Sequence, residues 1–137
     1  MELVTPDISY YREKHLISRC IYHIIFCSKY RRKVLISPID ERLKELIYEK
    51  QNEYDFNIIE LEIMPDHVHL LLSTSAKNSI YSIVSRLKGY TSNTLRAEFP
   101  SLKSRLPTLW TKGKFISSVG SVLLETVKKY IEDQKGV

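Results

Sequence analysis

The chain has 137 residues, of which 43% are hydrophobic and 27% charged, and its formal net charge at pH 7 is +5. This length suits one domain with one modest core, so we expect a single domain over residues 1–137. No apolar run approaches the roughly 18 residues of a membrane span, and the polar N-terminus lacks the apolar core of a secretory signal. We therefore expect a cytoplasmic protein with no membrane partner, whose positive charge permits an anionic partner without naming one.

The first third of the chain predicts a strand followed by a helix. Residues 1–17 show no clean period and are expected to form an N-terminal arm. Residues 19–28 are rich in β-branched and aromatic side chains, which predicts a first strand. Ser37 and Pro38 are typical of a helix start, with serine as the cap and proline at the first helical position. Apolar residues at helical spacing then continue to about Asp55.

The rest of the chain predicts a hairpin, a helix, a strand and a last helix. Residues 57–64 and 67–73 read as strands joined by a tight Pro65-Asp66 turn. The next elements are a helix at 79–98 interrupted at Gly89 and ended by Pro100, a basic loop at 101–113, a strand at 114–118 and a helix within 121–137. The resulting α+β order, β-α-β-β-α-β-α, is the ferredoxin-like, RRM-like antiparallel pattern plus one C-terminal helix. Because this scaffold serves many functions, the function must be argued from particular residues.

His67 and His69 stand two residues apart within an apolar run. Alternate strand residues point to the same face, so both imidazoles project together while Val68 and Leu70 point into a core. Such a pair is half of a metal site, although a surface pair or a hydrogen-bonded core pair would have the same pattern. Asp66 could orient one imidazole, and an aspartate after proline is also ordinary turn chemistry.

Tyr130 and Gln134 lie four residues apart on the predicted last helix, which places a phenol and an amide oxygen on one face. A phenol is a poor nucleophile at neutral pH unless a metal or cations favour the phenolate, and Lys128 and Lys129 supply cations. Alternatively, Tyr130 flanks the apolar stripe of the helix with its hydroxyl in water, and Gln134 is simply solvated.

Cations gather in three places that could contact nucleic acid. Around Gly89 they are mixed with aromatic rings, which suits a single strand with stacked bases. Solvated protein surfaces have similar composition, so charge alone does not decide between these readings. The candidate DNA-contacting residues are Lys29, Arg31, Arg32, Arg86, Lys88, Tyr90, Lys112 and Lys114. His15 and His23 match no ligand spacing and are expected to be packing or surface residues.

Three segments carry a family resemblance. They are Tyr-His-Ile-Ile-Phe-Cys-Ser-Lys-Tyr-Arg at 22–31, Met-Pro-Asp-His-Val-His-Leu at 64–70 and Tyr-Ile-Glu-Asp-Gln at 130–134. In this order and spacing, the chain from about residue 19 to residue 134 resembles the small single-tyrosine HUH transposases of prokaryotic insertion sequences, the IS200-like family. One departure is Lys114, which stands where the family often carries an aromatic residue and bears on DNA contacts rather than on chemistry.

The resemblance implies a DNA transposase that cleaves and rejoins single-stranded transposon ends, including hairpins, through a 5′-phosphotyrosine. Tyr130 would be the nucleophile, and His67, His69 and Gln134 would hold a divalent metal, Mg²⁺ or Mn²⁺, with Asp66 behind the histidines. It also implies a homodimer whose sheets join and whose active sites are shared in trans.

Two other functions stay open at this point. In a non-catalytic RRM-like binding module the histidine pair would be structural, but residues 67–73 carry no aromatic side chain to stack bases. In an HUH nicking nuclease of the replication or relaxase kind, the strand would be cut without transposition. The short chain, with no helicase or primase domain, favours the transposase.

Overall fold

The computed structural model describes residues 11–13, 16–18 and 20–119. Its elements are β1 (Tyr11–Glu13), β2 (Leu16–Ser18), β3 (Cys20–Cys27), the 3₁₀ turn η1 (Lys29–Arg31), α1 (Ile39–Glu49), α2 (Gln51–Tyr54), β4 (Phe56–Met64), β5 (His67–Thr74), α3 (Ile80–Glu98), α4 (Pro100–Arg105) and β6 (Phe115–Val119). The predicted α+β, ferredoxin-like order is confirmed, while the predicted C-terminal helix lies outside the described residues. No described helix is long and apolar enough to cross a bilayer.

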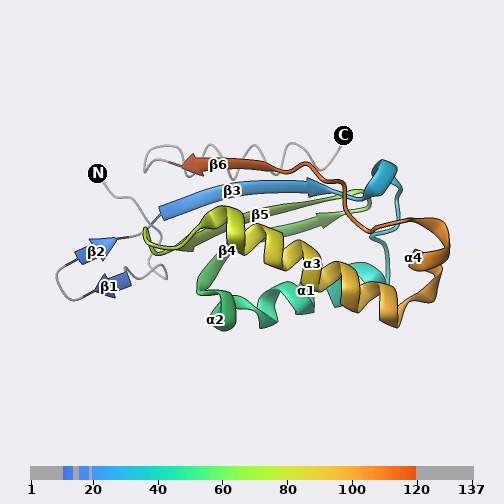
Figure 1. The fold of residues 1–137 in the computed structure, drawn as a ribbon, viewed down its shortest axis with the longest axis horizontal. Helices are drawn as coiled ribbons and strands as arrows, with labels where there is room; N and C mark the ends of the chain where they lie inside the picture. The colour runs from blue at the N-terminus through green and yellow to red at the C-terminus, as the bar shows by residue number, and fades with distance from the viewer. Residues whose placement is uncertain (1–10, 14–15, 19, 120–137) are drawn as a thin grey trace.

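The core lies between one antiparallel sheet and two helices. The strand order is β4-β5-β3-β6, so β5 and β3 are central and β4 and β6 are the edges. Helices α1 and α3 lie on the same side of this sheet (Figure 1). Val68, Leu70 and Leu72 of β5 pack into the core beneath these helices, and alternation turns His67 and His69 to the other side.

Helix α3 has the N-terminal signal that its sequence predicts. Ser79 has extended backbone angles, and its Oγ accepts a hydrogen bond from the Ser82 N–H at 3.1 Å. The predicted interruption at Gly89 is wrong, because α3 continues through it to Glu98. A glycine costs a helix interior only about 1 kcal/mol, which the buried stripe of Ile83, Val84, Leu87 and Leu95 outweighs.

Two predictions for the N-terminal half need correction. Residues 11–13 and 16–18 pair as an antiparallel two-stranded sheet, so the expected arm contains regular structure. Strands of three residues are too short to show a readable period. Helix α1 begins at Ile39 without a side-chain cap, because the Ser37 hydroxyl hydrogen-bonds the Glu41 carboxylate (3.3 Å) instead of a backbone N–H.

The expected basic loop at 101–113 is also more ordered than predicted. It begins within α4, and its end pairs with the chain after β3: the Lys29 N–H donates to the Leu109 carbonyl (2.7 Å) and the Thr111 N–H to the Cys27 carbonyl (3.0 Å). Trp110 is buried against the Phe26 ring at a centroid distance of 4.7 Å. The partner of this stretch is distant in sequence, so local patterning could not reveal the pairing.

Trp110 also offers a test of the core. Its Nε1–H donates to Thr91 Oγ1 (3.0 Å), which donates to the Leu87 carbonyl (2.7 Å), and Thr91 is fully buried. Thr91→Val preserves the shape but leaves the indole N–H unpaired, so the free energy of unfolding should fall by about 1–3 kcal/mol in chemical denaturation. In a Trp110→Phe background the same change should cost clearly less. An equal cost in both backgrounds would contradict this role for the hydrogen bond.

Candidate active site

Strand β5 presents the two predicted histidines side by side. The rings of His67 and His69 have centroids 4.7 Å apart at an interplanar angle of 77°, and both side chains are buried. The strand is paired on both edges, with His67 opposite Cys27 of β3 and Met64 of β4. The position of both imidazoles is therefore set by a central strand rather than by a loop.

Asp66 contacts the first histidine directly. Its Oδ1 lies 2.6 Å from His67 Nδ1. A carboxylate at Nδ1 makes that nitrogen the donor, which leaves the Nε2 lone pair as the ligand atom of a neutral imidazole. Burial favours a raised pKa for the Asp66 carboxyl, but the His67 hydrogen bond and the Arg31 charge outweigh it and hold the pKa below its ordinary value. Asp66 is accordingly ionised at neutral pH.

Arg31 holds the other oxygen of the same carboxylate. Its Nε and Nη2 lie 3.2 and 3.1 Å from Asp66 Oδ2. Because the Arg31 side chain is 63% exposed, this ion pair contributes at most about 1 kcal/mol of stability. Its main effect is orientation, since each of the two carboxylate oxygens now has its own partner, Arg31 at Oδ2 and His67 at Oδ1. The backbone reinforces this contact, because the Ser28 N–H donates to the Asp66 carbonyl at 3.0 Å.

The turn that carries Arg31 has unusual backbone angles. Tyr30 and Arg31 have φ values of 59° and 52°, in the left-handed region that favours glycine. Side chains in this region cost roughly 1–2 kcal/mol per residue, so neighbouring contacts must hold the turn in place. The Ser28 contact with Asp66 and the Lys29 contact with Leu109 do so. Strain of this kind gathers at functional sites.

His69 is buried in a state suited to binding a metal. Burial, with the neighbouring His67 and His23, lowers the pKa of His69 to about 4, so it is neutral at pH 7. Neither of its buried ring nitrogens has a hydrogen-bond partner among the described residues. A buried nitrogen without a hydrogen bond lowers the stability of the fold by roughly 1–3 kcal/mol, and a coordinated cation would supply a partner for one of the two nitrogens. The residues present therefore fit a divalent metal with two imidazole ligands.

A third ligand is not found in the described part of the chain, where no three His, Cys, Asp or Glu side chains cluster in a way that could hold a metal. The sequence predicts Gln134 for this position and Tyr130 for the nucleophile. Both lie outside the described residues.

His23 is a neighbour of the site that sequence reasoning missed. The packing role predicted for His23 is confirmed, because it is buried, and its place beside the site is new: its ring stacks on His69 at a centroid distance of 5.9 Å and an interplanar angle of 9°. On its other side it meets Phe115 of β6 edge-on at 5.8 Å. Burial lowers its pKa, so it too is neutral at pH 7. Only the register of β3 against β5 brings His23 here, and residue spacing carries no sign of it.

The predicted DNA-contacting residues fall in different places. Lys29, Arg31 and Arg32 lie in or beside η1, next to Asp66. Arg86 and Tyr90 belong to α3, on the helical side of the sheet. There the Arg86 guanidinium lies 4.1 Å from the Tyr54 ring centroid and Lys50 Nζ lies 4.1 Å from that of Tyr90. These two residues therefore already help to join α3 to α2 and its neighbours.

Lys88 and the two lysines before β6 form a separate group. Lys88 Nζ donates to the carbonyls of Thr111 (2.7 Å) and Gly113 (3.3 Å), which ties α3 to this loop. Burial, with the positive charge of Lys114, lowers the pKa of Lys88. Lys114 Nζ lies 4.2 Å from the ring centroid of the exposed Tyr81, while Lys112 is exposed.

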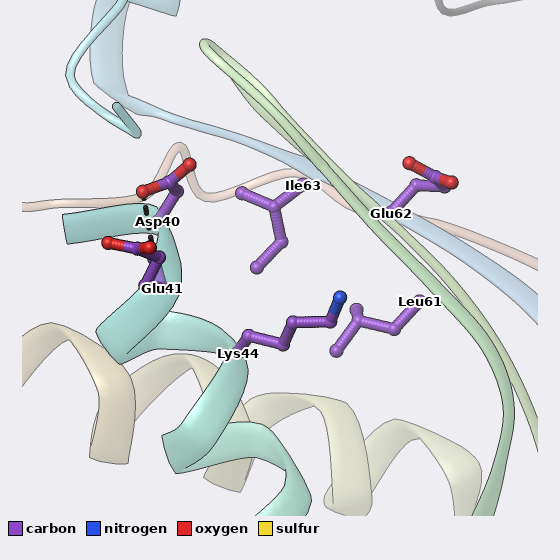
Figure 2. A pocket seen from close by; sticks show the side chains of 6 residues that line it. All are labelled: Asp40, Glu41, Lys44, Leu61, Glu62 and Ile63. Atoms are coloured by element: carbon purple, nitrogen blue, oxygen red, sulfur yellow. Dashed lines mark hydrogen bonds between the residues drawn. The ribbon is translucent and has the colours of Figure 1, made fainter. Parts of the chain in front are cut away.

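A pocket of about 200 Å³ lies elsewhere, between α1 and the edge strand β4. Figure 2 shows Asp40, Glu41 and Lys44 of α1 facing Leu61 and Ile63, while Glu62 points away from α1. The side chains that line this pocket include no histidine. This pocket is on the helical side of the sheet and does not belong to the histidine site.

The protein is of the ferredoxin-like α+β class, and its central strand β5 carries a pair of histidines. The family described as "Transposase IS200 like" matches residues 16–134. The chain therefore belongs to the IS200-like transposase family.

Individual relatives agree with this assignment. The ISDra2 transposase TnpA of Deinococcus radiodurans is 36% identical over 115 residues, 82% of each chain. The transposase of insertion sequence IS200 from Salmonella typhimurium is 29% identical over 126 residues, 88% of this chain and 83% of that protein.

Two solved structures share the fold. A D. radiodurans crystal structure described as a transposase aligns with a TM-score of 0.75 at 29% identity, covering 90% of this chain and 97% of that one. The structure of a REP-associated tyrosine transposase bound to a REP hairpin aligns with a TM-score of 0.61 at 13% identity, covering 91% and 69%.

The contact between Asp66 and His67 yields a prediction. Asp66→Ala should weaken Mn²⁺ binding by about 10- to 100-fold, because His67 loses the group that orients it, and Asp66→Asn, which keeps an acceptor oxygen, should weaken it less. Isothermal titration with Mn²⁺ measures both. In the metal-free protein, ¹⁵N shifts of His67 should show Nδ1 protonated in wild type and mixed tautomers in Asp66→Ala. Unchanged affinity and tautomer in Asp66→Ala would show that Asp66 does not orient the ligand.

Proposed function

We propose that this transposase cleaves and rejoins the single-stranded ends of its element through a covalent bond between DNA and Tyr130. The observation that supports this most strongly is the paired imidazoles of His67 and His69, with Asp66 directing Nε2 of His67 outward. In this proposal the Gln134 amide oxygen is the third ligand, beside one nitrogen of each imidazole. That mixed set leaves room for phosphate oxygens, and its nitrogen ligands favour Mn²⁺ while still accepting Mg²⁺.

In the cleavage step the phenolic oxygen of Tyr130 attacks the scissile phosphorus. A bond forms between this oxygen and the 5′-phosphate, and the bond from phosphorus to the 3′-oxygen breaks. The phenolic proton passes to solvent, and the departing 3′-oxygen takes up a proton from solvent to become a 3′-hydroxyl. A divalent cation held by His67, His69 and Gln134 would supply Lewis-acid stabilisation of the phosphate and of the departing 3′-oxygen. Because the phosphotyrosine conserves the energy of the broken bond, a 3′-hydroxyl of other DNA can attack it, rejoin the strand and release Tyr130.

The DNA substrate is proposed to be a single strand with hairpin ends. The cations in and beside η1 support this, because Arg31 pairs with Asp66, and Lys29 and Arg32 are its chain neighbours, so this turn could bind phosphates close to the histidines. The REP-associated tyrosine transposase, a structural neighbour, was solved with a hairpin bound. Lys112 and Lys114 are proposed as more distant phosphate contacts. For Arg86, Lys88 and Tyr90, any DNA contact would add to the packing roles described above.

The active unit is proposed to be a homodimer in which Tyr130 of one subunit serves His67 and His69 of the other. The edge strand β6 supports joined sheets, because among the described strands it pairs only with β3.

Tyr130→Phe should abolish cleavage and leave single-strand binding nearly unchanged, because it removes only the nucleophilic oxygen. The check is a denaturing gel of protein mixed with labelled element ends and Mg²⁺ or Mn²⁺, read for a covalent adduct, with binding followed by anisotropy. An adduct formed by the mutant would assign the nucleophile to another residue. Rejoining to a second labelled strand would separate a transposase from a nuclease that only nicks.

The trans arrangement predicts complementation between inactive subunits. Heterodimers of Tyr130→Phe with His67→Ala should recover up to half of wild-type cleavage, because one of their two composite sites has an intact tyrosine and an intact histidine pair. The heterodimers are obtained by co-expression with two affinity tags, and wild type prepared in the same way is the control. Inactive heterodimers beside active wild type would mean that each site is built within one subunit.

A further inference from the structure

Tyr30 has three properties that its place in the fold does not require. It is 64% exposed, which is high for a large aromatic side chain. It has a left-handed φ of 59°, a conformation that a tyrosine rarely adopts and that glycine adopts freely. It also lies between residues with fixed contacts, since Lys29 N–H bonds the Leu109 carbonyl and Arg31 bonds the Asp66 carboxylate. Tyr30 thus has an exposed ring on a strained turn, and contacts of the residues on both sides of it hold that turn in place.

The surroundings of this ring are cationic. Lys29 Nζ lies 5.3 Å from the Tyr30 ring centroid, and Arg32 and Lys33 are exposed on the following residues. Aromatic rings among cations are the arrangement with which proteins bind single-stranded nucleic acid, the ring stacking on a base and the cations binding the backbone.

The turn is also linked to the histidine site through one residue. Arg31, next to Tyr30, holds Asp66, and Asp66 contacts His67. A strand with one phosphate at the histidine pair would therefore pass the turn with a neighbouring nucleotide. We propose that Tyr30 stacks on a base of the single strand beside the scissile phosphate, while Arg32 binds its backbone. This inference rests on the proposed function. It adds a residue that contacts a base, whereas the residues named there bind the metal, bind phosphates or act as the nucleophile.

The left-handed angle allows a variant that separates binding from folding. Tyr30→Gly removes the ring at a position where glycine fits the backbone better, so the unfolding midpoint of the protein should stay the same or rise. Tyr30→Phe keeps the ring and should behave as wild type in binding. Tyr48→Ala removes another exposed tyrosine, on α1, and is the matched control.

Binding is measured by anisotropy in EDTA, so that no cleavage is needed, with an oligothymidylate and an abasic strand of equal length. Wild type, Tyr30→Phe and Tyr48→Ala should prefer the oligothymidylate. Tyr30→Gly should bind it about 5- to 150-fold more weakly and bind the abasic strand unchanged, the range expected for one lost stack. Arg32→Ala should weaken both probes and reduce the salt slope of log K by about 0.7.

Three results would overturn the proposal. If Tyr30→Gly binds oligothymidylate as wild type does, while wild type cleaves DNA, the ring does not contact a base and the proposed function stands without it. If Tyr30→Gly lowers the unfolding midpoint and weakens both probes equally, the ring is structural. A wild type that binds neither strand would overturn this inference together with the single-strand substrate of the proposed function.

Discussion

Strand β5 is buried on both faces, and the rest of the structure depends on this. One face carries Val68, Leu70 and Leu72 into the core under α1 and α3, and the other carries His67 and His69. A slip of one residue would place both imidazoles under the helices and turn Val68, Leu70 and Leu72 out of the core, so the register is strongly determined. Two neighbouring strands and the short Pro65-Asp66 turn hold it. The hydrophobic effect that forms the core thereby also positions the candidate ligands.

The turn after β3 uses this rigid hairpin as its support. Ser28 bonds the Asp66 backbone, and Arg31 bonds the Asp66 side chain. The individual contacts are worth little, because Arg31 is largely exposed, yet together they hold two left-handed residues that would otherwise relax. Tyr30 is therefore connected to His67 by a series of contacts: Arg31, its neighbour in the chain, pairs with Asp66, and Asp66 contacts His67. For the proposed cleavage of a single strand, preorganisation of these side chains matters more than the small stability that the contacts add.

The two sides of the sheet have different tasks. On the helical side, the cations near α3 are engaged with rings and carbonyls: Arg86 lies over Tyr54, and Lys88 bonds the Thr111 carbonyl. On the other side, the row of His67, His69 and His23 leads to Phe115 on the edge strand. Composition alone does not distinguish these sides, because the sequence does not show whether a lysine is already hydrogen-bonded to protein carbonyls or is free to bind a phosphate.

Residue patterns predict the order of the main strands and helices, the hairpin at Pro65-Asp66, the common face of His67 and His69 and the family resemblance, because all of these rest on local periodicity and short motifs. Other features came from the folded chain alone: His23 stacks on His69, Trp110 is buried against Phe26, Lys88 bonds the loop before β6 and Arg31 pairs with Asp66. Each of these contacts joins residues far apart in the chain. They arise from strand register and core packing, which depend on the whole fold, so the local sequence around each of these residues does not predict them.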